Sequence, residues 1–164
     1  AQARYGVARF PHTSSSRTCG SLAHYVARQC AFFISDNPVV MHDTVNQDPV
    51  RGTLGLAVTG IEVYLPLSGA LCLGFLCPTL EAMIRDGETR AARLGAPISF
   101  SQWTKALDEE KPLRLAPDNV THHNSLQVIN AERFVFSHDG DFALVRRMLE
   151  SNPELKAGAR YRST

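Results

Sequence analysis

The stretch Phe32-Phe33-Ile34-Ser35-Asp36-Asn37-Pro38-Val39-Val40 decides how this chain folds. Its apolar run is interrupted by three polar residues and a proline, and then resumes with two valines. Aromatic and β-branched residues favour strands, whereas Ser, Asp and Asn before Pro favour a turn. The stretch therefore predicts two buried pieces of strand on either side of a polar kink. Two further apolar runs, residues 61–68 and 133–137, are expected to pair with it.

Length and composition predict a single globular domain. The chain has 164 residues, of which 44% are hydrophobic and 20% charged. No apolar run reaches the roughly 18 residues that a membrane-spanning helix requires, so we expect a soluble chain without a membrane partner. Seventeen basic and sixteen acidic side chains give a net charge of +1. This balance does not support nucleic-acid binding, which remains only a possible interaction.

The cysteines and the first residues bear on the protein's location and completeness. Cys72 and Cys77 lie in an apolar segment, and none of the four cysteines forms the Cys-x2-Cys pair typical of zinc sites. Free thiols in a reducing, cytoplasmic environment are therefore expected. The chain begins with Ala1, and residues 1–9 do not contain the apolar core of a signal peptide, so we expect a processed product or a piece of a longer protein.

Periodicity and turn residues predict the order of elements. Residues 1–20 are expected to be a flexible arm or a linker from a missing upstream part, residues 21–155 one α+β domain, and residues 156–164 a frayed tail. The domain should contain a small mixed or antiparallel sheet, on which three or four of the expected helices pack. The strands are expected within 32–40, 56–66, 70–76 and 133–137, and the helices within 21–30, 78–93, 101–110, 118–130 and 142–150; residues 41–55 and 112–117 should be loops.

Three of these motifs, taken in order, resemble the C-terminal half of a family of bacterial and fungal proteins of unknown function. They are residues 32–39, with Ser-Asp-x-Pro, residues 61–68, which end in Pro-Leu-Ser, and residues 128–137, with Val-Ile-Asn followed by Arg-Phe-Val-Phe-Ser. The family's opening His-Tyr-Val-Pro motif is missing, and Gly69 stands where a second proline is usual. The resemblance implies no activity. It does imply that an active site built from both halves would be incomplete here.

Asp36 is the first candidate functional residue. A carboxylate at the end of a buried strand is a position where α/β-type proteins often hold a ligand or a metal. The alternative is structural, because Ser35, Asp36 and Asn37 before a proline also bond their own backbone in ordinary turns.

Histidines and acidic residues supply the remaining candidates. His42 and Asp43 follow the first strand, His122 and His123 begin a helix, and a late turn holds His138, Asp139 and Asp141. If these segments meet, imidazole and carboxylate ligands could bind a divalent metal whose bound water acts as a nucleophile. This hypothesis assigns catalysis to Asp36, His42 and His138, and metal binding to Asp36, His138 and Asp141. The alternative is that the histidines are scattered over the surface.

The sequence therefore predicts a metal-assisted hydrolase or nuclease. His-Glu-x-x-His, Gly-x-Ser-x-Gly, P-loop and Gly-x-Gly-x-x-Gly motifs do not occur, which argues against zinc peptidases, serine hydrolases and familiar nucleotide-binding folds. Two other hypotheses stay open. The chain could be a non-catalytic binding or regulatory module, or the C-terminal part of a larger protein that needs an upstream domain or a second chain.

Overall fold

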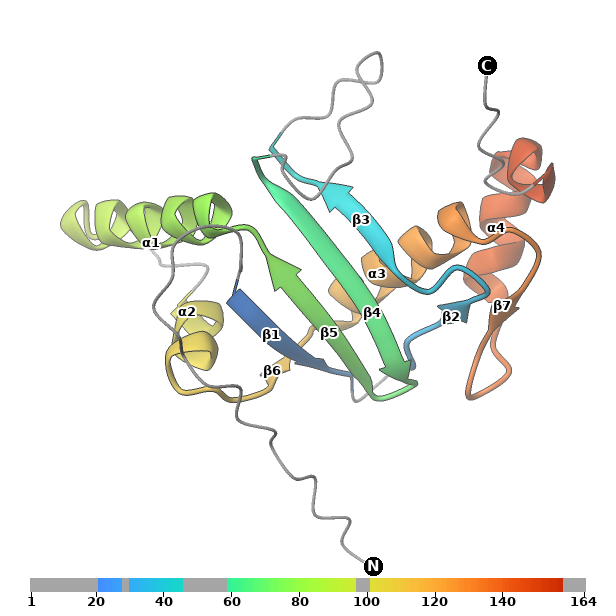
Figure 1. Cartoon of the computed structure of the whole chain (residues 1–164), viewed down its shortest axis with the longest axis horizontal. Helices are drawn as coiled ribbons and strands as arrows, with labels where there is room; N and C mark the ends of the chain where they lie inside the picture. The colour runs from blue at the N-terminus through green and yellow to red at the C-terminus, as the bar shows by residue number, and fades with distance from the viewer. Residues whose placement is uncertain (1–20, 28–29, 46–58, 97–100, 158–164) are drawn as a thin grey trace, which may run out of the picture.

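The computed structural model of the chain describes residues 21–27, 30–45, 59–96 and 101–157 (Figure 1). Helices and a mixed sheet together confirm the predicted α+β class. The elements in chain order are β1 (Ser21–Val26), β2 (Ile34–Ser35), β3 (Val40–Asp43), β4 (Ile61–Ser68), β5 (Leu71–Leu76), α1 (Pro78–Arg93), α2 (Ser101–Asp108), β6 (Leu113–Arg114), α3 (Pro117–Asn130), β7 (Val135–Phe136), α4 (Ala143–Ser151) and a final 3-10 helix (Pro153–Ala157).

The main sheet has the strand order β3-β4-β5-β1-β6. Its neighbours pair antiparallel, except that the edge strand β6 runs parallel to β1. β2 and β7 form a separate antiparallel pair. The prediction that the 32–40 and 133–137 runs join the main sheet is therefore wrong in part. Of β2, β3 and β7, only β3 lies in the main sheet. The polar kink between β2 and β3 turns the chain from the small sheet into the main sheet.

The helix predicted from Ser21 is also wrong, because residues 21–26 form strand β1. Leu22, Tyr25 and Val26 fit helical spacing, but Ala23, Tyr25 and Ala27 alternate as buried residues, which is the period of a strand. All six residues of β1 pair with β5. Tertiary pairing thus overrides an ambiguous local pattern. The predicted loop at 112–117 likewise contains β6 and the first residue of α3.

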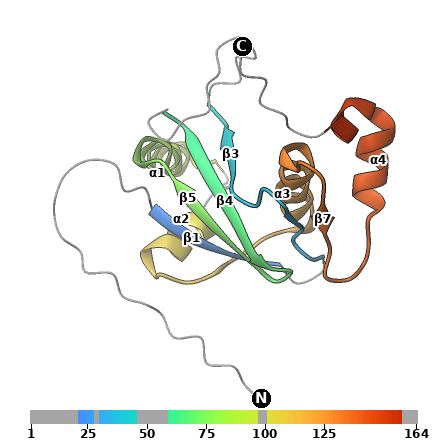
Figure 2. The same ribbon diagram turned by 45° about the vertical axis from the view of Figure 1, so that its right-hand side comes forward.

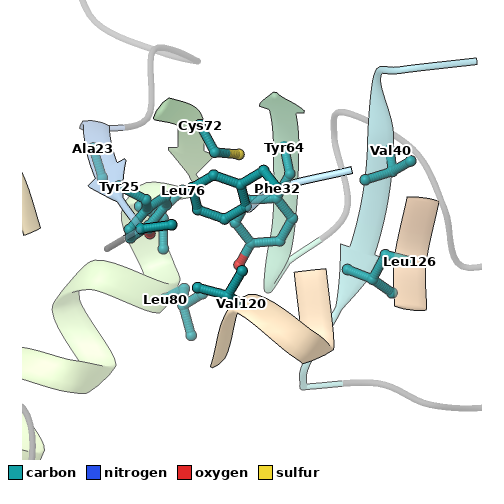
Figure 3. Packing of buried hydrophobic residues seen from close by; sticks show 11 residues of the cluster. Ala23, Tyr25, Phe32, Val40, Tyr64, Cys72, Leu76, Leu80, Val120 and Leu126 are labelled. Carbon is teal, nitrogen blue, oxygen red and sulfur yellow. The ribbon is translucent and has the colours of Figure 1, made fainter. Parts of the chain in front are cut away.

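The core lies between the main sheet and the helices. Side chains from the strands, among them Tyr25, Tyr64 and Cys72, pack against Leu80 of α1 and Val120 of α3. Figure 3 shows Phe32 and Tyr64 among these residues. Trp103 and Leu107 of α2 pack against the same cluster. All three helices therefore cover one face of the sheet, which we call the inner face (Figures 1 and 2).

The stretch that decides the fold is held by two side-chain amides of α3. Asn124 accepts a hydrogen bond from the backbone N–H of Phe33 at 2.8 Å and donates one to the carbonyl of Ala31 at 2.9 Å. Gln127 is fully buried, accepts from the backbone N–H and hydroxyl of Ser35, and donates to the carbonyl of Pro38. The amides thus satisfy buried backbone groups that have no strand partner.

No helix in the described part of the chain is long and apolar enough to cross a membrane. Residues 1–20 and 158–164, within the predicted arm and tail, lie outside the described residues, as does most of the predicted 41–55 loop.

Candidate acid–base site

A buried carboxyl group lies on the inner face of β4. Glu62 is only 8% exposed, although β4 is otherwise apolar around it. The hydroxyl of Thr44 donates to one carboxyl oxygen, and the hydroxyl of Tyr64 donates to the other. Alternation along β4 places Glu62 and Tyr64 on the same face, and the end of β3 brings Thr44 beside them. A carboxyl group with a partner on each oxygen is held in a fixed orientation.

The surroundings of Glu62 change its acidity. Burial raises the pKa of this carboxyl, and the nearby Asp43 adds to the rise. The hydrogen bond from Thr44 and the charge of His122 act in the opposite direction without cancelling it. Glu62 therefore takes up a proton more readily than an exposed glutamate does.

Two histidine rings meet at the edge of this carboxyl. His42 lies opposite Glu62 in the β3–β4 register, and His122 comes from the first half of α3. Their ring centroids are 5.1 Å apart in an edge-to-face arrangement. Partial burial and the neighbouring His42 lower the pKa of His122, whereas Glu62 acts to raise it. His122 is exposed and His42 half-buried, so both can be reached by solvent.

A third histidine lies deeper, among aromatic rings. His123 is 7% exposed and packs edge-on against Tyr64, with ring centroids 4.3 Å apart. Tyr25 and Phe32 contact the same ring. Burial, reinforced by His122 and His42, lowers the pKa of His123 to about 4. Burial also raises the pKa of Tyr25 to about 12. Both side chains are therefore neutral at pH 7, and Nδ1 of His123 has no hydrogen-bond partner within the described residues.

We call Thr44, Glu62, Tyr64, His42 and His122 the Glu62 site. It combines a carboxyl group of raised pKa with two accessible imidazoles, one of which has a lowered pKa. Groups with shifted pKa values gather at sites of proton transfer, although structural networks also shift them. Chemically, this arrangement can take a proton from one group and give a proton to another.

Asp36, the first residue singled out from the sequence, lies elsewhere. Its carboxylate accepts backbone hydrogen bonds from Glu132 at 2.9 Å, Arg133 at 2.9 Å and Phe134 at 3.2 Å. Desolvation acts to raise the pKa of Asp36, but these N–H donors outweigh it and lower the pKa. Asp36 thus holds the segment before β7 against the chain that follows β2. These hydrogen bonds are the kind expected if Asp36 has a structural role. A catalytic or metal-binding role for Asp36 stays a prediction.

His138 and Asp141 lie in the turn that follows β7. His138 packs so closely against Gly69 that a β-carbon on this glycine would lie 2.8 Å from that of His138. Asp141 accepts a hydrogen bond from the backbone N–H of Ala143, at the start of α4. Among the described residues, no three His, Cys, Asp or Glu side chains form a group that could hold a metal ion. The assignment of His138 and Asp141 as ligands therefore stays a prediction.

His42 was predicted from the sequence as a site residue, whereas Glu62 and Tyr64 were not. The signal was present in Ile61-Glu62-Val63-Tyr64-Leu65, where one acidic residue interrupts an apolar strand. Alternation puts this acidic side chain on the same face as Tyr64, and a charged residue on a buried face requires partners. The pairing with His42 could not be predicted, because it depends on the β3–β4 register.

Comparison with known proteins places the chain in a family. The family described as "Protein of unknown function (DUF4238)" matches residues 17–141, which include the whole Glu62 site. Neither the curated proteins nor the solved structures give a match. The prediction of a family of unknown function is thereby confirmed, while the bacterial and fungal origin and the motifs of the resemblance remain predictions. The chain belongs to the DUF4238 family of proteins of unknown function.

Proposed function

We propose that the protein is a hydrolase or nuclease that works by general acid–base catalysis at the Glu62 site. The observation that carries the proposal is the facing pair of accessible imidazoles, His42 and His122, beside the buried carboxyl of Glu62. Histidine is the side chain best suited to exchange protons near neutral pH. Two imidazoles side by side provide both a proton acceptor and a proton donor.

In the proposed reaction, His122 is the general base, since its lowered pKa keeps the ring neutral near pH 7. It takes a proton from water as the water oxygen bonds to the phosphorus or carbonyl carbon of the substrate. Protonated His42 gives a proton to the leaving oxygen as the ester bond breaks. Exchange with solvent restores both rings. Glu62, when ionised, favours the protonated form of His122 that arises during the step.

An activity screen tests this proposal. Single-stranded RNA, single-stranded DNA, bis(4-nitrophenyl) phosphate and 4-nitrophenyl acetate serve as substrates, each with and without EDTA. Replacing a general acid or base typically costs about 10²–10⁴-fold in rate, so we expect such losses in His42→Ala and His122→Ala. EDTA should leave the activity unchanged, because the proposed step uses no metal ion.

His138→Ala separates this proposal from the metal-assisted mechanism predicted from the sequence. The acid–base proposal expects full activity in this variant, whereas the metal-assisted mechanism expects both His138→Ala and EDTA to abolish turnover. Loss of activity both in His138→Ala and in the presence of EDTA would contradict the acid–base proposal. Absence of turnover on all four substrates would favour the alternative of a non-catalytic binding module.

A further inference from the structure

The main sheet has a second face, on the side away from the helices, which we call the outer face. Register brings its side chains together, because Leu22 pairs with Phe75, which also pairs with Val63, and Leu73 pairs with both His24 and Leu65. On β1, β5, β4 and β3, the open part of this face consists of nine side chains: Leu22, His24, Val26, Met41, Val63, Leu65, Leu71, Leu73 and Phe75.

None of these nine side chains belongs to the core between the sheet and the helices. Leu22 is 40% exposed and Phe75 is 42% exposed, and the other seven are partly exposed. In Figures 1 and 2, no helix of the described residues passes in front of β1, β5 and β4. At the end of the face near Gly60, Asp43 and Ile61 are buried.

The composition of the outer face does not suit contact with water. An antiparallel sheet with one solvated face normally alternates apolar residues inward and polar residues outward. Here, eight of the nine outward positions are apolar and the ninth is a histidine. Contiguous apolar patches of this kind mark interaction sites in soluble proteins. We therefore expect another protein surface to pack against the outer face.

We infer that a second copy of the chain covers the outer face and that the protein forms a two-fold symmetric dimer through it. A two-fold axis places the same patch against itself, so the patch must be compatible with its own charge. None of the nine positions carries Asp, Glu, Lys or Arg, and the whole chain has a net charge of only +1. The exposed Arg114 pairs with Val26 and lies at the β6 edge of this face, two strands from Leu73. The centres of two outer faces can therefore meet without like-charge repulsion.

The size of the outer face also fits a dimer. Four strands about 4.8 Å apart, each with about six residues at roughly 3.3 Å per residue, give a flat area of about 400 Å². The accessible surface of protruding side chains exceeds this flat area, so two copies bury on the order of 1,000 Å² together, the lower bound for a specific interface. Two sheets that pack face to face lie about 10 Å apart, with Leu73 of the middle strand near the axis.

The chain's own residues outside the described ranges are the alternative occupants. Residues 1–20 contain only three large apolar side chains, Tyr5, Val7 and Phe10, which are few for a face of nine. Residues 46–58 contain four, Val50, Leu54, Leu56 and Val58, residues 97–100 contain Ile98 and Phe100, and residues 158–164 contain Tyr161. No single one of these segments supplies more than four, whereas a second copy supplies eight apolar side chains on one continuous face, which is why we favour it.

Sedimentation velocity of the full chain over a hundredfold range of concentration tests the inference. We expect a dimer at the higher concentrations and a monomer on dilution. Leu73→Glu and Phe75→Glu each place two carboxylates in the interface, so their dissociation constants should rise by about a hundredfold or more. Leu94→Glu is the matched control, because Leu94 is 78% exposed at the end of α1 and should leave the dimer intact.

Circular dichroism checks that the glutamate variants are folded. If they unfold, the dilution series of the wild-type chain decides alone. A wild-type chain that stays monomeric throughout would overturn the inference and favour cover by the chain's own residues. A dimer that persists in folded Leu73→Glu and Phe75→Glu would place the interface elsewhere and overturn it too. The Glu62 site lies on the inner face, so these outcomes are independent of those for the proposed activity.

Discussion

At the scale of single residues, burial separates side chains of the same type into different chemical roles. His122 and His123 are neighbours in α3, yet one reaches solvent beside His42 and the other lies among aromatic rings. Glu62 shows the same effect on a strand, where two hydroxyl partners allow a carboxyl group to remain buried. The environment, rather than the residue type, decides which groups exchange protons near pH 7.

His123 makes the stability of the protein depend on pH. Its folded-state pKa of about 4 lies below its ordinary value, so the unfolded chain binds the proton more readily. The stability contribution is complete above about pH 6.5 and is lost as the pH falls toward 4, by about 3 kcal/mol in total. Phenylalanine cannot be protonated. On acidification, we therefore expect the free energy of unfolding of His123→Phe to fall by about 3 kcal/mol less than that of the wild type.

Urea unfolding of wild type and His123→Phe at pH 7 and pH 4.5 measures this difference. The surrounding groups that titrate, Glu62, His42 and His122, are present in both proteins, so the comparison isolates His123. His138→Phe is the control, because it removes a histidine that is exposed rather than buried. An unchanged pH dependence in His123→Phe would show that His123 is not buried in its neutral form.

Cys77 should be the more reactive of two part-exposed thiols. It caps the N-terminus of α1, where its sulfur accepts backbone hydrogen bonds from Gly60 at 3.1 Å and Leu80 at 3.4 Å. Desolvation acts to raise its pKa, but these donors lower it, whereas burial and Asp139 raise the pKa of Cys30. Since the thiolate is the reactive form, iodoacetamide at pH 7 should alkylate Cys77 faster.

Mass spectrometry of the alkylated peptides gives both rates from one sample. Buried Cys72 should stay unmodified in the folded protein and react in urea. Faster alkylation of Cys30 than of Cys77 would contradict the arrangement at the start of α1.

At the scale of elements, α3 connects the deciding stretch to the Glu62 site. One face of this helix carries Asn124 and Gln127, which hold the backbone of residues 31–38. The preceding turn carries His122 and His123, which face β3 and β4. The position of α3 therefore fixes the start of β3 and the histidine pair together.

Gln127→Met tests this connection. Methionine keeps the shape of the side chain but leaves the N–H of Ser35 and the carbonyl of Pro38 without their amide partner. Buried polar groups left unsatisfied cost about 1–3 kcal/mol each, so the free energy of unfolding should fall by roughly 3 kcal/mol. Gln102→Met, at an exposed position of α2, should change it by no more than about 0.5 kcal/mol.

Urea titration followed by circular dichroism measures both variants. Equal stabilities of Gln127→Met and Gln102→Met would mean that the amide does not hold the stretch.

Strong local patterns predicted the long elements, and tertiary contacts decided the rest. β5, α1 and α4 follow clear periodicity and turn signals, and each was predicted to within one residue. The strand predicted at 56–66 begins only at Ile61, because residues 59–60 form a turn. β1 has a pattern that fits a helix or a strand, and only its pairing with β5 settles the choice. The Glu62 site joins β3, β4 and α3, so no local pattern could reveal it. His42 was found because residue type alone suggested it.

At the scale of the whole molecule, the sheet separates two functions that we propose. Its inner face carries the core and the Glu62 site, and its outer face carries the apolar patch that we assign to a dimer. A partner on the outer face leaves the histidine pair accessible. The same strands can therefore support both assembly and catalysis without competition for space.

The pH dependence of hydrolysis in the presence of EDTA tests the proposed catalytic role of the Glu62 site most directly. The account predicts a bell-shaped profile of kcat/KM, because the base must be unprotonated and the acid protonated. Its acidic limb should lie below pH 6.5, since the pKa of His122 is lowered, and should flatten in His122→Ala. A profile of unchanged shape and rate in His122→Ala, or activity that EDTA abolishes, would contradict the account.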